Sequence, residues 1–405
     1  MQDNEKKPAL RFKGFTDPWE QRKLGEITEE LSDYATQESG LPLLTSSRSG
    51  LIYQDEYRDS RTTKSTETLF SVVPVGVCTY RHMSDDDVFH MNINKLEKGL
   101  VSREYPVYKA TDANDLKFVV QHINSCEEFK AFCAEQKKGG TRTRLYYNTL
   151  CQFSIRVPKL EEQTEISQYL DKLDTLITLH QRKYEKLVNI KKSMLDKMFP
   201  KNGASVPEIR FKGFTDPWEQ RKLTDIADKV TEKNASLEYI ETLTNSAEYG
   251  IISQRDFFDH DISKMGSLSG YYVVRNEDFV YNPRISTTAP VGPINRNKLG
   301  RTGVMSPLYT VFRPHDIDTT YLEYFFKSGY WHSFMYFNGD SGARSDRFSI
   351  KDTVLFEMPV PQPKIEEQKK IGKYLTELDT LITLHQRKLE KLQNIKKSCL
   401  EKMFV

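Results

Sequence analysis

Residues 158–199 read PKLEEQTEISQYLDKLDTLITLHQRKYEKLVNIKKSMLDKMF, and residues 363–404 repeat this stretch as PKIEEQKKIGKYLTELDTLITLHQRKLEKLQNIKKSCLEKMF. The offset is 205 residues, and 31 of the 42 positions are identical. Such a long internal repeat favours a chain of two similar halves over the number of domains that length alone would suggest.

Apolar residues recur in each copy at alternating steps of four and three, which is the seam of a coiled coil. The positions in the first copy are Ile166, Leu170, Leu173, Ile177, His180, Tyr184 and Leu187, and in the second Ile371, Leu375, Leu378, Ile382, His385, Leu389 and Leu392. A helix of about 40 residues is roughly 60 Å long. We expect the two seams to be buried against each other, with His180 and His385 as a polar layer that fixes the register.

A second repeat, RFKGFTDPWEQRKL, opens both halves without change at residues 11–24 and 210–223. Its Gly, Asp and Pro indicate turns, and its Phe and Trp side chains are apolar anchors. It is therefore interpreted as a docking segment that seats each globular domain on the helices. A nuclease-like cluster of Asp17, Glu20 and Lys23 is a weaker reading. The expected segments are a first domain at 1–157, a long helix at 158–200, a linker at 201–209, a second domain at 210–362 and a second long helix at 363–405.

The two domains diverge in sequence but keep a shared skeleton. Val72-Val73 and Val273-Val274 open similar stretches in which Tyr80 aligns with Tyr281, and residues 99–108 align with residues 303–312. These β-branched and aromatic runs, broken by Gly and Pro, predict strands. The predicted fold class is α+β: two similar domains of mixed strands and helices, separated by a pair of long antiparallel coiled-coil helices, with pseudo-two-fold symmetry.

Composition and missing motifs exclude several classes of protein. Net charge is +2, the five cysteines form no CxxC pair, and no apolar run approaches the roughly 18 residues that cross a bilayer, so we expect a cytoplasmic protein without a zinc site. No GxxxxGK[ST] motif is present, and Asn282-Pro283-Arg284 departs at its third residue from the Asn-Pro-Pro-aromatic motif of methyltransferases. The sequence therefore predicts no catalytic residues, metal site or cofactor.

Two variable domains, each followed by a helix that carries LDTLITLHQRK and ends in KKSMLDKMFP or KKSCLEKMF, resemble the specificity subunit of a Type I restriction-modification enzyme. The resemblance covers essentially the whole chain, and residues 78–94 and 279–312 look like its target-recognition domains. It implies a non-catalytic DNA-binding subunit whose two domains each read one half of a bipartite, asymmetric target, while the helices set the spacer between the halves.

The resemblance also implies the partners of such a subunit. Two methyltransferase (modification) subunits would dock on the helical region, and motor-nuclease (restriction) subunits would join for cleavage in phage defence. S-adenosylmethionine, ATP and magnesium would belong to these partners. Two other classes stay open on the residues alone: a nuclease or methyltransferase fused to two DNA-reading heads, and a coiled-coil adaptor.

Candidate DNA contacts are Arg, Lys and Asn side chains, which form bidentate contacts with base edges, together with nearby aromatic and hydroxyl side chains. In the first domain they are Tyr80, Arg81, His82, Ser84, Lys95, Arg142 and Arg144. In the second they are Tyr281, Asn282, Arg284, Ser286, Thr287, Asn295, Arg296, Asn297, Lys298, Arg301, Arg344 and Arg347. Packing is the alternative for Tyr80 and Tyr281, a turn for residues 295–297, and ion pairs with local acids for the arginines that follow Gly139-Gly140 and Gly342.

Overall fold

The computed structural model describes residues 7–57, 68–137, 141–201, 204–258, 265–341 and 346–404. The chain forms two compact units, Met1–Gln181 with Arg387–Val405 (unit 1) and Arg182–Gln386 (unit 2). Each unit contains one of the two variable domains and a part of both long helices. Both units combine helices with antiparallel strands, which confirms the predicted α+β class.

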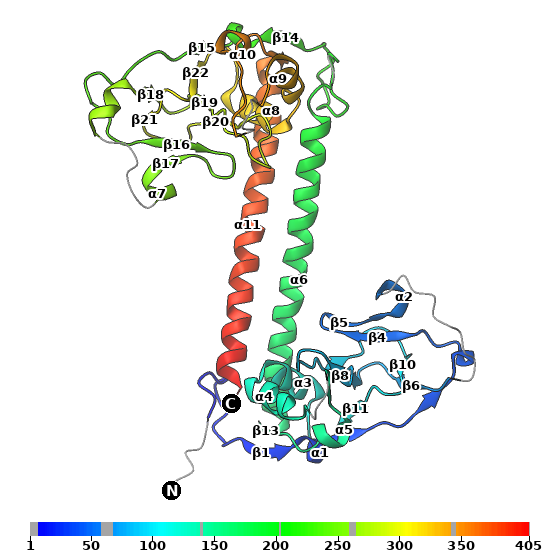
Figure 1. The fold of residues 1–405 in the computed structure, drawn as a ribbon. Coiled ribbons are helices and arrows are strands. Elements are labelled where there is room, and N and C mark those ends of the chain that lie inside the picture. Colours follow the sequence, from blue (N-terminus) through cyan, green and yellow to red (C-terminus); the bar gives the residue numbers. More distant parts are fainter. Residues whose placement is uncertain are drawn as a thin grey trace. The chain divides into compact units, whose positions relative to one another are not determined.

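The repeated segments form helices α6 (Leu160–Lys197, 38 residues) and α11 (Ile365–Met403, 39 residues), as their spacing predicts. In unit 1, Leu170 near the start of α6 shares a core with Met403 at the end of α11, so the two helices run antiparallel there (Figure 1). In unit 2, Leu375 near the start of α11 shares a core with Met198, just beyond the end of α6. The predicted seam residues are buried at the start of each helix and half-buried further along.

Each unit contains a four-stranded antiparallel sheet with the same order of equivalent strands. In unit 1 the order is β2-β11-β7-β9, and in unit 2 it is β15-β22-β19-β20. The strands expected from the aligned residues 99–108 and 303–312 are β10–β11 and β21–β22. The two domains, which differ in sequence, therefore share the same arrangement of strands, as the repeated helix sequences suggest for the two halves.

The strands of unit 1 are β1 (Glu20–Lys23), β2 (Thr28–Glu30), β3 (Tyr34–Ala35), β4 (Leu44–Ser47), β5 (Gly50–Tyr53), β6 (Phe70–Val73), β7 (Cys78–Thr79), β8 (Met83–Ser84), β9 (Asn92–Ile93), β10 (Gly99–Ser102), β11 (Val107–Ala110), β12 (Thr143–Arg144) and β13 (Ser154–Val157). Its shorter helices are α1 (Leu24–Ile27), η1 (Gln37–Ser39), α2 (Gln54–Tyr57), α3 (Leu116–Ser125), α4 (Glu127–Glu135) and α5 (Tyr147–Leu150).

The strands of unit 2 are β14 (Glu219–Lys222), β15 (Ala227–Lys229), β16 (Leu243–Ser246), β17 (Gly250–Ser253), β18 (Tyr272–Val274), β19 (Phe279–Tyr281), β20 (Ile294–Arg296), β21 (Gly303–Met305), β22 (Thr310–Pro314) and β23 (Pro359–Gln362). Its shorter helices are η2 (Leu223–Asp225), α7 (Gln254–Phe258), η3 (Met265–Gly270), α8 (Thr319–Ser328), α9 (His332–Asn338) and α10 (Asp352–Leu355).

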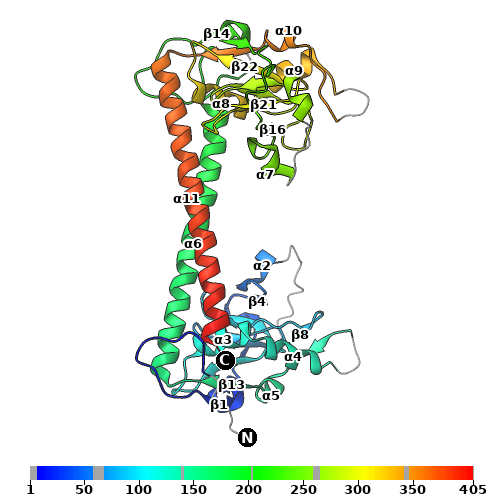
Figure 2. The same ribbon diagram turned by 90° about the vertical axis from the view of Figure 1, so that its left-hand side faces the viewer.

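A helix with a capped N-terminus follows the sheet in both units. The carboxylate of Asp115 accepts a hydrogen bond from the backbone N–H of Phe118 at the start of α3, and Asp318 does the same for Tyr321 in α8. Helix α8 packs beside α11 (Figure 2), and the Tyr324 hydroxyl donates a hydrogen bond of 2.8 Å to Asp379. These helices connect each sheet to the long helices.

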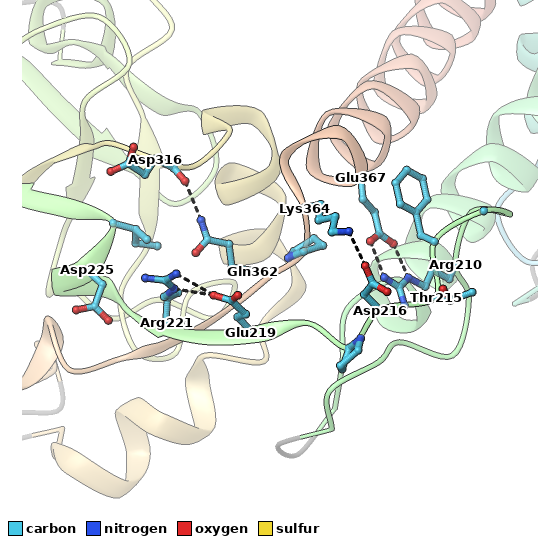
Figure 3. Close-up of a pocket in the computed structure, with 15 residues that line it drawn as sticks. Arg210, Thr215, Asp216, Glu219, Arg221, Asp225, Asp316, Gln362, Lys364 and Glu367 are labelled. Carbon is cyan, nitrogen blue, oxygen red and sulfur yellow. Dashed lines mark hydrogen bonds and ion pairs between the residues drawn. The ribbon is translucent and has the colours of Figure 1, made fainter.

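The docking segment connects each domain to its long helix through a buried ion pair. The guanidinium of Arg11 donates two hydrogen bonds to Glu162, of 2.6 and 2.7 Å. Arg210 and Glu367 form the equivalent pair at 2.7 and 2.8 Å (Figure 3). The Glu162 side chain is only 2% exposed. Because the geometry is bidentate and the site is buried, the pair fixes where the segment meets the helix.

Four residues near the end of each docking segment, Glu20–Lys23 and Glu219–Lys222, form a strand that pairs with the strand just before the long helix. Glu20 is opposite Val157 in the β1–β13 pair, and Glu219 is opposite Gln362 in the β14–β23 pair. The identical docking sequences therefore adopt the same structure in both units.

Replacing Arg11 with Ala is expected to lower the free energy of unfolding by about 3 kcal/mol, because Glu162 would remain charged and buried without its partner. Urea denaturation of the full chain measures this change. The control is Arg22→Ala in the same segment, whose exposed pair with Glu20 should contribute at most about 1 kcal/mol. Equal unfolding midpoints for the two variants would contradict a structural role for the Arg11 pair.

Candidate nucleic-acid interface

The structure brings the two predicted DNA-binding features of unit 1 together. The stretch after Tyr80 forms β8, which pairs with β12 so that Met83 lies opposite Arg144. The backbone N–H of Leu145 donates a hydrogen bond of 2.8 Å to the carbonyl of His82. The loop with Arg144 is thus held beside the end of the sheet, and the Arg144 side chain is exposed.

Unit 2 repeats this arrangement with different side chains. The stretch after Tyr281 forms a bridge in which Arg284 lies opposite Arg347. The backbone N–H of Phe348 donates a hydrogen bond of 2.7 Å to the carbonyl of Pro283, equivalent to the bond from Leu145 to His82 in unit 1. Arg347 therefore corresponds to Arg144, and Arg284 corresponds to a methionine.

Arg284 and Arg347 place two like charges directly opposite each other. Residues paired across an antiparallel bridge share one face, and like charges in that position destabilise the pairing. Both side chains are exposed, and none of the described residues forms an ion pair with either of them or with Arg144. An anionic ligand that lies on this face would compensate the repulsion.

Several predicted contact residues are buried, and here the structure corrects the prediction. Tyr80 is 0% exposed, Tyr281 is 2% exposed and Asn297 is 0% exposed. His82 and Ser84 are also buried. These side chains cannot reach a duplex in this structure. The packing role left open for the two tyrosines is the one observed, because both lie in the cores of their units.

Two predicted arginines are exposed but already paired with acids. Arg142 donates a 2.7 Å hydrogen bond to Asp85, and Arg301 forms a bidentate pair with Glu241 at 2.7 and 2.8 Å. For Arg142 the alternative of a local ion pair is therefore the observed one. Direct binding of DNA by these residues would require the pairs to break.

Arg296 and Lys298 belong to a charge cluster around Glu323 on α8. Arg296 contacts the Glu323 carboxylate at 2.7 Å, Lys298 at 2.8 Å and Lys327 at 2.6 Å. Burial alone would raise the pKa of Glu323, but the surrounding Lys327 and Lys298 lower it to about 2. Arg296 is largely buried, so its role in this structure is to hold β20 on α8 and not to contact a base.

The predicted Asn282 and Asn295 take part in an internal network centred on the buried Asn245. The side-chain amide of Asn282 donates a 2.8 Å hydrogen bond to the carbonyl of Asn245, and that of Asn295 donates a 2.7 Å bond to the Asn245 side-chain oxygen. Asn245 in turn donates to the carbonyl of Val280. Both predicted residues therefore position the loops around the sheet.

A shared Asn-x-Asn pattern is the signal that sequence reasoning missed. Asn92 and Asn94 in unit 1 correspond to Asn295 and Asn297 in unit 2. The amide of Asn92 donates a 2.7 Å hydrogen bond to Ser46, and the amides of Asn94 and Asn297 bond to backbone carbonyls. In both domains, the two asparagines of this pattern therefore hold a hairpin and a turn in place through their side-chain hydrogen bonds.

Unit 1 also contains a polar hollow of about 520 Å³ that the sequence did not indicate. It is lined by Arg48 and Arg81 together with Asp85 and Asp86, and Arg48 is paired with Asp86. Guanidinium groups bind guanine and carboxylates accept from the cytosine amine, so both signs of charge suit base edges. Burial lowers the pKa of His82, which lies between the lining residues Arg81 and Met83 in the sequence.

The remaining predictions fall into two groups. Exposed predicted residues with no ion pair among the described residues are Arg81, Lys95, Arg144, Arg284, Ser286, Thr287 and Arg347. Arg344 lies outside the described residues. Over the described ranges, no group of three or more His, Cys, Asp or Glu side chains is placed to hold a metal ion, and no helix has the length and apolar character of a membrane span.

A model of the family "Type I restriction modification DNA specificity domain" matches residues 107–189 and 215–394, about two thirds of the chain. The chain belongs to this family. The resemblance inferred from the repeated helices is thereby confirmed. The matched ranges include β11, most of both long helices and the sheet of unit 2, so the specificity-domain match covers residues from both halves.

Two curated relatives are similar to this chain in sequence, and one crystal structure is similar in fold. The Type I restriction enzyme MjaVIII specificity subunit of Methanocaldococcus jannaschii is 24% identical over 66% of this chain, and the putative MjaX specificity subunit of the same organism is 25% identical over 70%. The alignments span 65% of the length of each relative. The crystal structure of a Type I S subunit from M. genitalium has the same fold, with a TM-score of 0.56, 12% identity and 99% coverage of both chains.

Replacing Glu323 with Gln is expected to destabilise unit 2 of this specificity-family protein by roughly 3 kcal/mol at pH 7. This is the free energy that corresponds to lowering the pKa of Glu323 from 4.5 to about 2 on folding. Because the folded pKa lies below the unfolded one, the ionised group stabilises the fold above pH 4.5, and this contribution is lost as pH falls towards 2. Urea unfolding at several pH values measures the difference.

The control for this prediction is Glu241→Gln, whose partner Arg301 is half exposed. It should change stability by less than about 1 kcal/mol. A Glu323→Gln variant whose stability deficit is the same at pH 3 and pH 7 would contradict the assignment of this ion cluster.

Proposed function

We propose that this chain is the non-catalytic specificity subunit of a Type I restriction-modification enzyme, and that it binds double-stranded DNA at a bipartite, asymmetric target. Unit 1 reads one half of the target, and unit 2 reads the other. The observation that supports DNA binding most directly is that Arg284 and Arg347 are exposed, lie opposite each other and have no acidic partner among the described residues. In unit 1, Arg144 occupies the position of Arg347. Phosphates on this face would neutralise these charges, and guanine edges could accept hydrogen bonds from the guanidinium groups.

The difference between the units supports an asymmetric target. Equivalent backbone positions carry Met83 with Arg144 in unit 1 and Arg284 with Arg347 in unit 2. The hydrogen bonds that position both loops are retained, while the side chains that would face DNA differ. A shared scaffold with different exposed side chains is suited to two different half-sites.

We also propose that two methyltransferase subunits dock on the long helices, and that motor-nuclease subunits join the complex for cleavage. Leu176 and Leu179 of α6 are 42% and 45% exposed, and the identically placed Leu381 and Leu384 of α11 are 41% and 44% exposed. Exposed leucines three residues apart form an apolar stripe that a partner helix can cover. S-adenosylmethionine, ATP and magnesium would be bound by these partners and not by this chain.

Arg347→Ala should weaken DNA binding by about tenfold and reduce the slope of log affinity against log salt by about 1, because one phosphate contact would be lost. Titrations with a fluorescent duplex at several salt concentrations measure both quantities. The matched control is Arg301→Ala, which removes the same charge from unit 2 but from a residue already paired with Glu241. If both variants show the same small effect, only net charge matters and the proposed contact is wrong.

Leu176→Glu should prevent one methyltransferase subunit from binding, because a charge would be buried on the apolar stripe of α6. The control is Thr178→Glu, an exposed position about 160° around the same helix. Co-purification and size-exclusion chromatography give the number of bound partner subunits. Loss of partner binding in the Thr178 variant as well would contradict a specific stripe.

Mapping methylation in cells tests the proposed function as a whole. The chain is co-expressed with its methyltransferase subunit in a host that lacks other modification, and methylated adenines are located by sequencing genomic DNA. We expect a single bipartite motif with a constant gap. An assembled complex that methylates no such motif would contradict the proposal and favour an adaptor.

A further inference from the structure

Helix α9 of unit 2 ends in an exposed aromatic pair. Among the described large apolar side chains Phe337 is the most exposed, at 90%, and the preceding Tyr336 is 57% exposed. Isolated exposed apolar residues are common on protein surfaces, but here an almost fully exposed Phe directly follows an exposed Tyr near the end of one helix.

The end of α9 adjoins the segment that carries Arg347. The Tyr336 ring contacts the ring of Phe348 at 6.1 Å between centroids, and Phe348 directly follows Arg347. The chain beyond Phe337 pairs with the same segment, because Asp340 and Ser349 form an antiparallel bridge. Aromatic rings and unneutralised positive charge therefore occur on neighbouring segments of one unit.

Aromatic and cationic side chains that lie close together can bind both the bases and the phosphates of DNA. Arginines neutralise the phosphates, while rings stack on bases or insert between base steps and unstack them. We propose that Phe337, supported by Tyr336, stacks on or wedges into the bases of the half-site that unit 2 reads. This inference rests on the proposed function and adds to it an aromatic contact that the arginines alone would not provide.

Unit 1 has no such contact at the equivalent place. Helix α4, which follows α3 as α9 follows α8, ends in Ala134 and Glu135 before Gln136 and Lys137. The aromatic residue in the last turn of α4, Phe132, packs on Phe153 and is not exposed as Phe337 is. The proposed distortion of DNA is therefore confined to one half of the target, and unit 1 supplies an internal control.

The test uses the full chain, assembled with its methyltransferase subunits, and a duplex that carries the mapped target. The fluorescent base 2-aminopurine is placed at successive positions of each half-site, where its emission rises when it is unstacked. We expect one position in the unit 2 half-site to brighten with the wild type and not with Phe337→Ala. Affinity should fall about tenfold or more in this variant with an unchanged salt slope, and Phe337→Trp should restore it.

Three results would overturn the proposal, and they are distinguishable. If Phe337→Ala binds and brightens like the control Ile240→Ala, another exposed apolar residue of unit 2 at 72%, then there is no wedge. If Phe337→Ala fails to assemble with the methyltransferase subunits, the ring contacts a protein partner. If the wild-type complex does not bind the mapped duplex at all, the proposed function itself is wrong.

Discussion

The buried pairing of an arginine with the first-turn glutamate of a long helix is the interaction on which each half of this protein depends. It joins the docking segment to the first turn of the helix, next to the strand pairing that joins the same segment to the strand preceding the helix. Burying a charge without a partner is costly, so Arg11 and Glu162 tolerate few other arrangements of the segment. The ion pair therefore contributes more to fixing one position of the docking segment on the helix than to the net free energy of unfolding.

The same interaction explains which parts of the chain are constant and which vary. The docking segment and the helices are nearly identical in the two halves because they meet each other through the same bonds. The domains only need to keep the sheet order and the asparagine contacts that close their hairpins, as Asn92 and Asn295 do. Their exposed loops are thus free to differ, which a modular reader of two half-sites requires.

Much of the fold could be predicted from the sequence because it lies in repeats and periodicity. The spacing of Leu170 and its neighbours determines a helix and its buried face without any knowledge of the partner. The loops with Arg144 and Arg347 could also be selected as candidates, because small residues next to arginines indicate an exposed polar loop. Their pairing with the segments after Tyr80 and Tyr281 depends on long-range strand contacts, which local patterns do not contain.

Residue type alone could not distinguish side chains that are free to contact DNA from side chains that support the fold. Asn297 and Arg347 are both suited to bases, yet one closes a buried turn and the other is exposed. The difference depends on burial and on partners more than 20 residues away, such as Val274 for Asn297 and Glu323 for Arg296. Only the three-dimensional structure supplies this information.

The central claim is that each half contains a domain that recognises its own half-site, attached to a docking segment and a long helix that are repeated in the chain. The most direct measurement replaces residues 224–362 with a second copy of residues 25–157 and maps the adenines methylated by the assembled complex. Two independent readers predict a target that consists of two copies of the first half-site. A target that retains the original second half, or an assembled complex that methylates no bipartite site, would contradict the account.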